Sequence, residues 1–236
     1  MRKGTEIAEL VKAVRSFSGR NAYEVFSDFA EMAAMSIVQV FTLNKDKTEE
    51  QLKAIRRKYS PAELKRFGEM LGMMIVAMDE YVKQGRYIDI IAEVFMQLEI
   101  YNKNVGQFFT PRSVAELSAR MVFDAGKARE IIAKEGYIAI NEPAVGGGVM
   151  ILAFAEAMRA AGLNPSKHLL IYAGDIDHRC VCMSYLHFAL YGLPAVVVHG
   201  DALSLDEWQR WYSPVYIMDR WCFKDKGRRR HESKGN

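Results

Sequence analysis

The chain has 236 residues, of which 50% are hydrophobic and 26% are charged. This length suits one large domain or two small ones, and the composition is that of a folded globular protein rather than a disordered one. The net charge of +3 is too small to indicate nucleic-acid binding, and much of the positive excess lies in the final stretch KDKGRRRHESKGN.

Three cysteines, Cys180, Cys182 and Cys222, favour a reducing compartment over a disulfide scaffold. No second Cys/His pair stands at ligand spacing, so we expect no metal site. The N-terminus lacks the hydrophobic core of a signal peptide, and no apolar run reaches the roughly 18 residues of a membrane span. We therefore expect a cytoplasmic protein that does not enter a membrane.

Residues 1–104 are expected to form a helical N-terminal domain. The stretch AYEVFSDFAEMAAMSIVQVF carries apolar residues at alternating spacings of three and four, which predicts a helix with one buried face. A second helix is expected to begin at Ser60 as N-cap, with Pro61 at its first position and Glu63 at its third. The stretch YIDIIAEVFMQLEIY predicts a further amphipathic helix.

Residues 105–220 show a different pattern. Short β-branched runs at 137–140, 168–173 and 195–199 predict strands, and the segments between them, 148–162 and 179–192, predict helices that end at glycines. This alternation, with strands apolar on both faces, favours a parallel sheet covered by helices. Residues 221–236 are expected to form a basic C-terminal tail.

Three consecutive glycines follow the first predicted strand, in the stretch YIAINEPAVGGGVM. In an open parallel sheet, ligands bind beyond the carboxyl ends of the strands, where Gly146, Gly147 and Gly148 are expected to lie. Missing side chains would let a ligand approach the backbone at a helix N-terminus. The alternative is a tight strand-to-helix turn with no ligand.

Acidic residues are expected at three successive strand ends: Glu142, Asp175 and Asp201. Carboxylates that converge on one edge repel one another unless they bind hydrogen-bond donors or a cation. A nucleoside with a cationic amino-acid tail would supply both. Asp175 is the candidate for the ribose hydroxyls, whereas Asp177 could instead cap the next helix. Neither the G-x-G-x-x-G pattern of an NAD fold nor a Walker loop is present.

Two motifs carry a resemblance to a known family. The loop EPAVGGG resembles the S-adenosylmethionine loop of DNA adenine methyltransferases, and GQFFTP at 106–111 resembles the aromatic-Thr-Pro element of N6-adenine methylases, including the modification subunits of type I restriction systems. The lead-in DIIAEVFMQLE and the later GDID and GDAL acids follow in the family's order, so the resemblance covers about 88–204. It implies a truncated Rossmann-like S-adenosylmethionine-dependent methyltransferase sheet with an all-α N-terminal domain.

The resemblance also implies a cofactor site. Its expected members contact the methionine part (Phe108, Phe109, Thr110), the amino-acid end (Glu142, Pro143, Ala144, Gly146, Gly147, Gly148), the ribose (Asp175) and the adenine (Ile176, Asp201, Ala202). Thr110 and Pro111 also read as a local helix start, with Thr110 as N-cap.

The catalytic element of this family, [DN]-P-P-[FYW] at the end of the fourth strand, has one candidate here, in YSPVYIM. Ser213 would take the place of the amine-holding residue, Pro214 would be retained, and Tyr216 would stack on a flipped base. A serine has one hydroxyl and no negative charge, so it would activate the amine poorly. The alternative is that SPVYIM is simply the fourth strand.

Three functions remain open. The first is a DNA adenine-N6 methyltransferase that acts on DNA. The second is a catalytically degenerate protein of a mobile element that binds S-adenosylmethionine or a partner and acts on restriction-modification or regulation. The third is a small-molecule methyltransferase with a closed pocket near 212–216. A sheet of four strands would also leave an edge exposed, which predicts coverage by the helical half, self-association or a protein partner.

Overall fold

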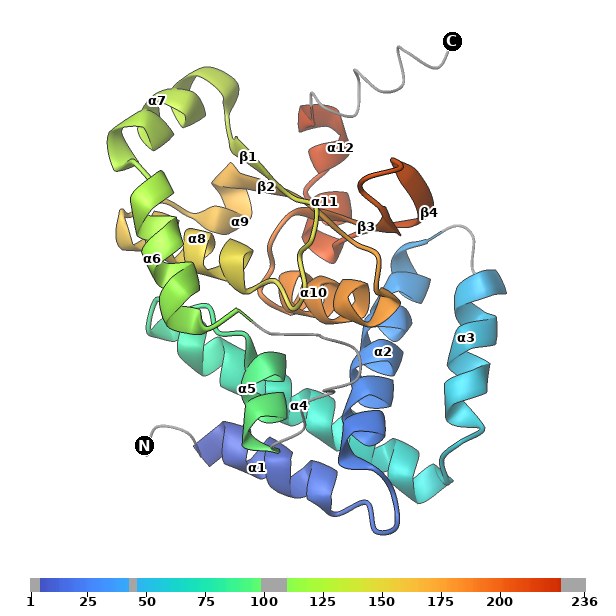
Figure 1. Cartoon of the computed structure of the whole chain (residues 1–236). Helices are drawn as coiled ribbons and strands as arrows, with labels where there is room; N and C mark the ends of the chain where they lie inside the picture. Colours follow the sequence, from blue (N-terminus) through green and yellow to red (C-terminus); the bar gives the residue numbers. More distant parts are fainter. Residues whose placement is uncertain (1–4, 43–45, 99–109, 226–236) are drawn as a thin grey trace.

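The structure, a computed structural model, describes residues 5–42, 46–98 and 110–225. In Figure 1 the N-terminal helices lie below a small sheet, and the remaining helices surround that sheet. No helix of the described residues is long and apolar enough to cross a membrane.

The first part of the chain is helical, as expected. Its helices are α1 (Thr5–Arg15), α2 (Ala22–Phe41), α3 (Asp46–Arg56), α4 (Pro61–Lys83) and α5 (Ile90–Gln97). The start of α4 confirms the local prediction, because Ser60 and Glu63 form a reciprocal capping box with Pro61 at the first turn.

The second part alternates helices and strands. Its elements are α6 (Arg112–Val122), α7 (Ala125–Glu135), β1 (Ile138–Glu142), α8 (Val149–Ala160), α9 (Pro165–His168), β2 (Leu169–Asp175), α10 (His178–Leu190), β3 (Ala195–Asp201), β4 (Asp206–Tyr212), α11 (Pro214–Met218) and α12 (Trp221–Lys224). The three predicted strands and the two helices between them are confirmed.

The sheet has the order β1-β2-β3-β4, with β1, β2 and β3 parallel and β4 antiparallel to β3. The three predicted strands are therefore parallel, as expected, and the fourth strand, β4, which was not predicted, is antiparallel. The reason is the length of the connection: only residues 202–205 separate β3 from β4, whereas a parallel crossover needs about a dozen residues.

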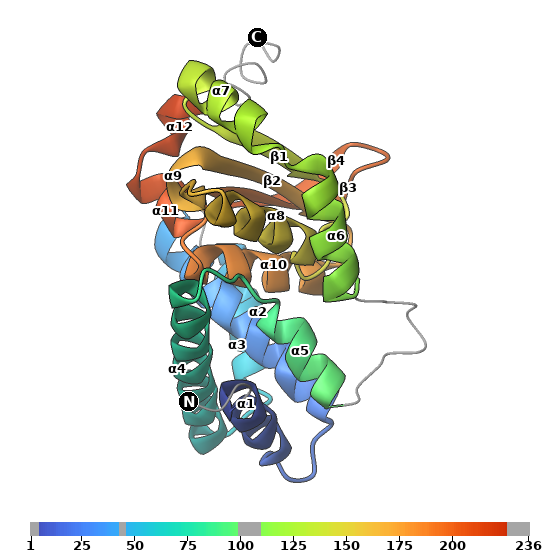
Figure 2. The same cartoon turned by 90° about the vertical axis from the view of Figure 1, so that its left-hand side faces the viewer.

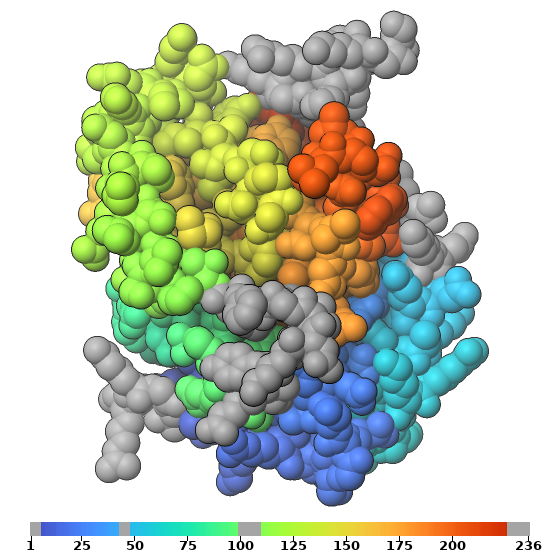
Figure 3. All heavy atoms as spheres, in the orientation of Figure 1, coloured from blue at the N-terminus to red at the C-terminus, as the bar shows by residue number. Residues whose placement is uncertain are grey.

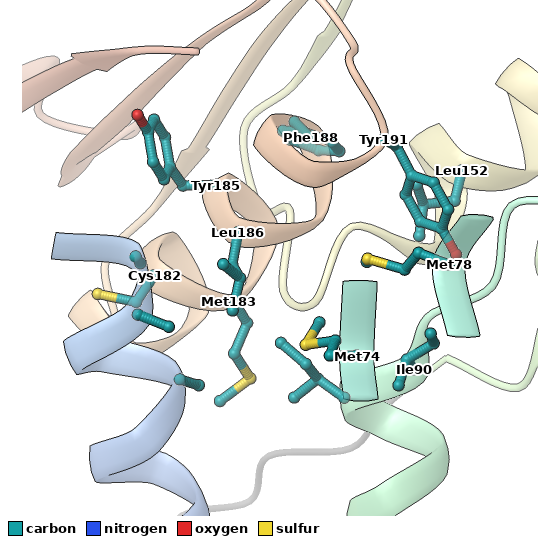
Figure 4. Packing of buried hydrophobic residues seen from close by; sticks show 14 of the residues in the cluster. Met74, Met78, Ile90, Leu152, Cys182, Met183, Tyr185, Leu186, Phe188 and Tyr191 are labelled. Carbon is teal, nitrogen blue, oxygen red and sulfur yellow. The ribbon is translucent and has the colours of Figure 1, made fainter. Parts of the chain in front are cut away.

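One face of the sheet packs on α8 and α10, and α10 in turn packs on the N-terminal helices. Figure 4 shows Cys182, Met183 and Leu186 of α10 pointing toward these helices, with Met74 of α4 facing them. One cluster of buried hydrophobic residues joins the two parts, with members from Ile7 of α1 to Trp211 of β4. In the space-filling view of Figure 3, the blue and cyan helices lie directly against the part that carries the sheet.

The other face of the sheet is covered by α11 and α12. Trp221 and Tyr216 pack there against Tyr137, Leu170 and Val196. Trp221 is 1% exposed, and Asp225 is also buried and accepts hydrogen bonds from two tyrosine hydroxyls. The expected basic tail is thus wrong for 221–225, because these residues are packed, while 226–236 lie outside the described residues.

The outer edge of β1 carries no strand among the described residues. Figure 2 looks on to the side of the molecule that carries this strand, with α6 and α7 beside it. The described N-terminal helices pack instead on α10, and α2 also touches β4.

Candidate cofactor-binding site

The glycine loop lies at the carboxyl end of β1, as expected, and it is tied to the next strand by two hydrogen bonds. The Val145 amide donates to the Gly174 carbonyl, and the Gly146 amide donates to Asp175 Oδ2, both at 2.9 Å. The other carboxylate oxygen, Asp175 Oδ1, accepts from the Asp177 amide at 2.9 Å. Asp175 therefore orders both the glycine loop and the start of α10.

The three glycines differ in what surrounds them. Gly146 has φ +53° and a Cβ added there would meet open space. A Cβ at Gly147 would lie 2.4 Å from Asp89 Oδ2, and one at Gly148, where φ is +97°, would lie 3.2 Å from the Phe188 ring. Packing within the protein thus accounts for Gly147 and Gly148, whereas no atom of the described residues blocks the space beside Gly146.

Helix α8 begins directly after the loop, and Gly148 is its N-cap. No side chain caps this 12-residue helix, so its first amide groups have no side-chain acceptor. Such groups and the helix dipole favour a negatively charged group, for example a carboxylate. Glu142 is the last residue of β1, level with Ala173 of β2, and its carboxylate suits an ammonium group.

The remaining predicted cofactor residues lie along the same edge. Asp175 stands level with His199 on β3, two residues before Asp201. Ile176 follows Asp175 and is 61% exposed, so a flat apolar group has access to it. Pro143, Ala144 and Ala202 are exposed as well. Asp201 Oδ1 accepts from the Leu203 amide at 2.8 Å, within its own turn.

These residues fit a nucleoside with an amino-acid tail. Each oxygen of Asp175 accepts one amide, and a carboxylate oxygen has two lone pairs, so two acceptor positions remain for hydroxyl groups. Asp177 caps α10 through the Arg179 amide, which confirms its local role.

The aromatic-Thr-Pro element is described only in part. Phe108 and Phe109 lie outside the described residues. Thr110 is exposed, and the helix begins one residue later than expected, with Pro111 as N-cap in an extended conformation. The prediction of Thr110 as N-cap is therefore wrong, and the first turn of α6 has no side-chain cap.

The structure does not bring the expected catalytic residues to this edge. Ser213 is fully buried, its hydroxyl donates to the Leu193 carbonyl at 2.8 Å, and it accepts from the Ala195 amide at 2.9 Å. Ala195 is the first residue of β3 and Asp201 the last, a separation of about 20 Å at 3.3 Å per residue. Ser213 therefore lies at the amino ends of the parallel strands, whereas the acids lie at their carboxyl ends.

Pro214 and Tyr216 belong to α11, so the alternative that this stretch is the fourth strand is also wrong. Tyr216 is 2% exposed, stacks on Tyr212 at 5.0 Å and donates a hydrogen bond to Asp225. Its ring is not available to a flipped base. The same packing fills the region in which the small-molecule alternative places a substrate pocket.

Two residues beneath the glycine loop were not singled out from the sequence. Asp89 is the N-cap of α5 and His187 lies on α10; they are 5% and 0% exposed. Burial raises the pKa of the Asp89 carboxyl, and burial lowers the pKa of the His187 imidazole. The available signal was a polar residue inside each of two apolar runs, YIDII and SYLHFAL.

Comparison with known proteins identifies the family. The family model described as N-6 DNA Methylase matches residues 86–230. A stretch of 143 residues is 23% identical to the type I restriction enzyme MpnII methylase subunit of Mycoplasma pneumoniae, covering 57% of this chain and 24% of that protein. The chain thus spans about a quarter of the length of this curated relative.

A solved structure gives a weaker match. The type I restriction-modification methyltransferase subunit from Streptococcus thermophilus aligns with 86% of this chain and 59% of its own, at 14% identity and a TM-score of 0.38. The family assignment depends on the family model, which spans more than half of the sequence. On that match, the chain belongs to the N-6 DNA methylase family.

Proposed function

We propose that this chain binds S-adenosylmethionine at the carboxyl edge of β1–β3 and serves as the cofactor-binding part of a DNA adenine-N6 methyltransferase. Members of the N-6 DNA methylase family use S-adenosylmethionine as methyl donor. The main observation behind the proposal is that the Asp175 carboxylate accepts two hydrogen bonds, one from the glycine loop and one from the residue that caps α10. These bonds hold the loop and the start of α10 in place at the carboxyl ends of the strands.

Each part of the edge has a role in the proposal. The uncapped start of α8 and the open space at Gly146 receive the carboxylate of the cofactor, and Glu142 receives its ammonium group. Asp175 accepts the ribose hydroxyls. Ile176 offers an exposed apolar side chain to the adenine. When bound, S-adenosylmethionine supplies an electrophilic methyl group.

The residues that hold the target amine of the DNA base are proposed to lie outside the described residues. Ser213 cannot hold a target amine, because both of its hydrogen-bonding functions are used at the amino ends of the parallel strands. A protein partner, as part of a restriction-modification assembly, is the proposed source of the amine-holding residues and of DNA recognition. The proposal includes the cytoplasmic location, where S-adenosylmethionine and DNA are both available.

The first experiment is a calorimetric titration of the full chain with S-adenosylmethionine, with Asp175→Ala as the test variant. Micromolar binding that is lost in the variant supports the proposal, whereas no binding by the wild-type chain overturns it. Asp124→Ala is the matched control, because Asp124 caps α7 through the Lys127 amide, away from the site.

A methyl-transfer assay then distinguishes a chain that methylates DNA alone from one that needs a protein partner. Labelled methyl groups transferred to unmethylated DNA by the chain alone would contradict the need for a partner. Cofactor binding without transfer, followed by transfer after addition of a cell extract as a source of partners, is the expected result.

A further inference from the structure

A buried acid and a buried histidine connect the helical part of the chain to the glycine loop. Asp89 Oδ1 accepts from the Ala92 amide at 2.8 Å at the start of α5, and Asp89 Oδ2 points at Gly147. His187 Nδ1 lies 2.9 Å from the Gly147 carbonyl, and His187 Nε2 lies 3.6 Å from Asp89 Oδ1. Asp89 Oδ2 and His187 Nε2 have no hydrogen-bond partner among the described residues.

The carbonyl of Gly147 determines which ring nitrogen carries a proton. A carbonyl oxygen only accepts hydrogen bonds, so His187 Nδ1 must be the donor. In a neutral imidazole, Nε2 then presents a lone pair to the Asp89 carboxyl group. If Asp89 were also ionised, two acceptors would face each other at a site where neither meets water.

We infer that Asp89 and His187 together carry one proton besides the proton on Nδ1, on either the carboxyl group or Nε2, and that this pair positions the glycine loop through the Gly147 carbonyl. One proton removes the conflict whether it is nearer the acid or the imidazole. The pair joins α5 to α10 and then to the loop, three segments far apart in the sequence. It also explains Gly147, because any side chain there would displace the Asp89 carboxyl group.

The surrounding groups are consistent with a single shared proton. The charge of Arg112 of α6 acts to lower the pKa of Asp89, and Arg112 is itself held by Glu156 of α8 at 2.8 Å. Tyr191 stacks on the His187 ring at 6.3 Å, and its hydroxyl donates to the Ile88 carbonyl. Arg112 therefore favours a proton on the imidazole, and burial opposes charge on both members of the pair.

The direct test requires no variant. Long-range proton–nitrogen NMR of the nitrogen-15-labelled full chain reports the state of the His187 ring. The expected spectrum has a proton on Nδ1 and a single ring state from pH 5.5 to 8.5. A bare Nδ1, or a ring that titrates as an exposed histidine does, would overturn the inference.

Substitutions separate the pair from the helix cap. Asp89→Ser keeps an N-cap residue but removes the carboxyl group that reaches His187. The expected result is hydrogen exchange of the Gly146–Gly148 amides that is at least about tenfold faster, through local opening of the loop. Asp124→Ser, the same substitution at the N-cap of α7, is expected to leave the hydrogen-exchange rates of those amides unchanged. Equal loop exchange in Asp89→Ser and wild type would contradict the positioning role.

A double substitution keeps the test valid if Asp89→Ser destabilises the whole chain. Gly147→Ala alone collides with Asp89, whereas in the Asp89→Ser background the added methyl group has space. The double variant is expected to be more stable than the sum of the single effects predicts, and simple additivity would count against the inference.

The inference rests on the proposed function only in its consequence for cofactor affinity. Asp89→Ser is expected to weaken S-adenosylmethionine binding because the loop is less well positioned. If the wild-type chain binds no cofactor, the proposed function fails, while the NMR and exchange measurements still decide the role of the pair.

Discussion

The carboxylate of Asp175 accepts the amide of Gly146 at 2.9 Å, so the end of β2 holds the loop that follows β1. Asp201, at the corresponding end of β3, accepts hydrogen bonds from the Leu203 and Ser204 amides of its own turn, and from no other amide of the described residues. Two acids at equivalent strand ends therefore have different structural tasks, and this difference is open to measurement.

Asp175→Ala is expected to lower the free energy of unfolding by about 1–3 kcal/mol, because it leaves two amides without their charged acceptor. Asp201→Ala is expected to cost less than about 1 kcal/mol, since its turn is exposed to water. Urea unfolding of both variants measures the difference. Equal costs would mean that Asp175 does not hold the loop.

Ser213→Ala tests the structural role of the predicted catalytic serine. Removing the hydroxyl leaves the buried Ala195 amide and Leu193 carbonyl without their partner, at a cost of about 1–3 kcal/mol. Affinity for S-adenosylmethionine, measured by calorimetry, is expected to stay the same. The control is Ser204→Ala, an exposed serine. Loss of methyl transfer in a fully stable Ser213→Ala protein would restore the catalytic interpretation.

Two glycines with opposite surroundings predict opposite effects. Gly148→Ala forces a side chain into a left-handed conformation and against Phe188, so it is expected to destabilise the chain by at least about 1 kcal/mol. Gly68 lies within α4, where an added Cβ meets nothing within 4 Å, and Gly68→Ala is expected to stabilise by about 0.5–1 kcal/mol. Thermal unfolding distinguishes the two signs.

Glu63 is expected to contribute to the loss of stability of the helical N-terminal part at low pH. Its hydrogen bond to Arg20, together with the Ser60 cap, lowers the pKa of Glu63 from 4.5 to about 2. A lowered pKa in the folded state stabilises the fold above pH 4.5, and this contribution disappears as the pH falls toward 2.

The variant Glu63→Gln is therefore expected to reduce Tm at pH 7 and to match wild type near pH 2. Glu69→Gln, an exposed change in the same helix, is the control. A Tm difference that is constant across this pH range would exclude the charge of Glu63 as the cause.

The two tryptophans Trp221 and Trp208 test whether the chain after β4 is part of the fold. Trp221 is 1% exposed and Trp208 is 48% exposed. Trp221→Ala is expected to cost about 3–5 kcal/mol, as for other buried aromatic truncations, and Trp208→Ala less than about 1 kcal/mol. Urea unfolding followed by circular dichroism measures both. A small cost for Trp221→Ala would mean that α12 does not stabilise the sheet face.

The sequence by itself determined the features that depend on nearby residues. Ser60, Pro61 and Glu63 predict the start of α4 because a capping box is closed within one helical turn. Short β-branched runs that alternate with longer helical segments predict three strands and the helices between them, because these patterns depend only on residues close together in the sequence. The glycine loop and the acids at the strand ends follow from the same alternation.

Only the tertiary structure decided which residues far apart in the sequence meet. The short turn after β3 sets the direction of β4, but only the tertiary structure shows that β4 pairs with β3 on the side away from β2 and that Ser213 lies beside the first residue of β3. The contact of Asp89 and His187 with Gly147 likewise joins three segments that no local pattern connects. Such contacts are selected by the packing of the whole core, since each segment alone lacks the buried surface that would hold it in place.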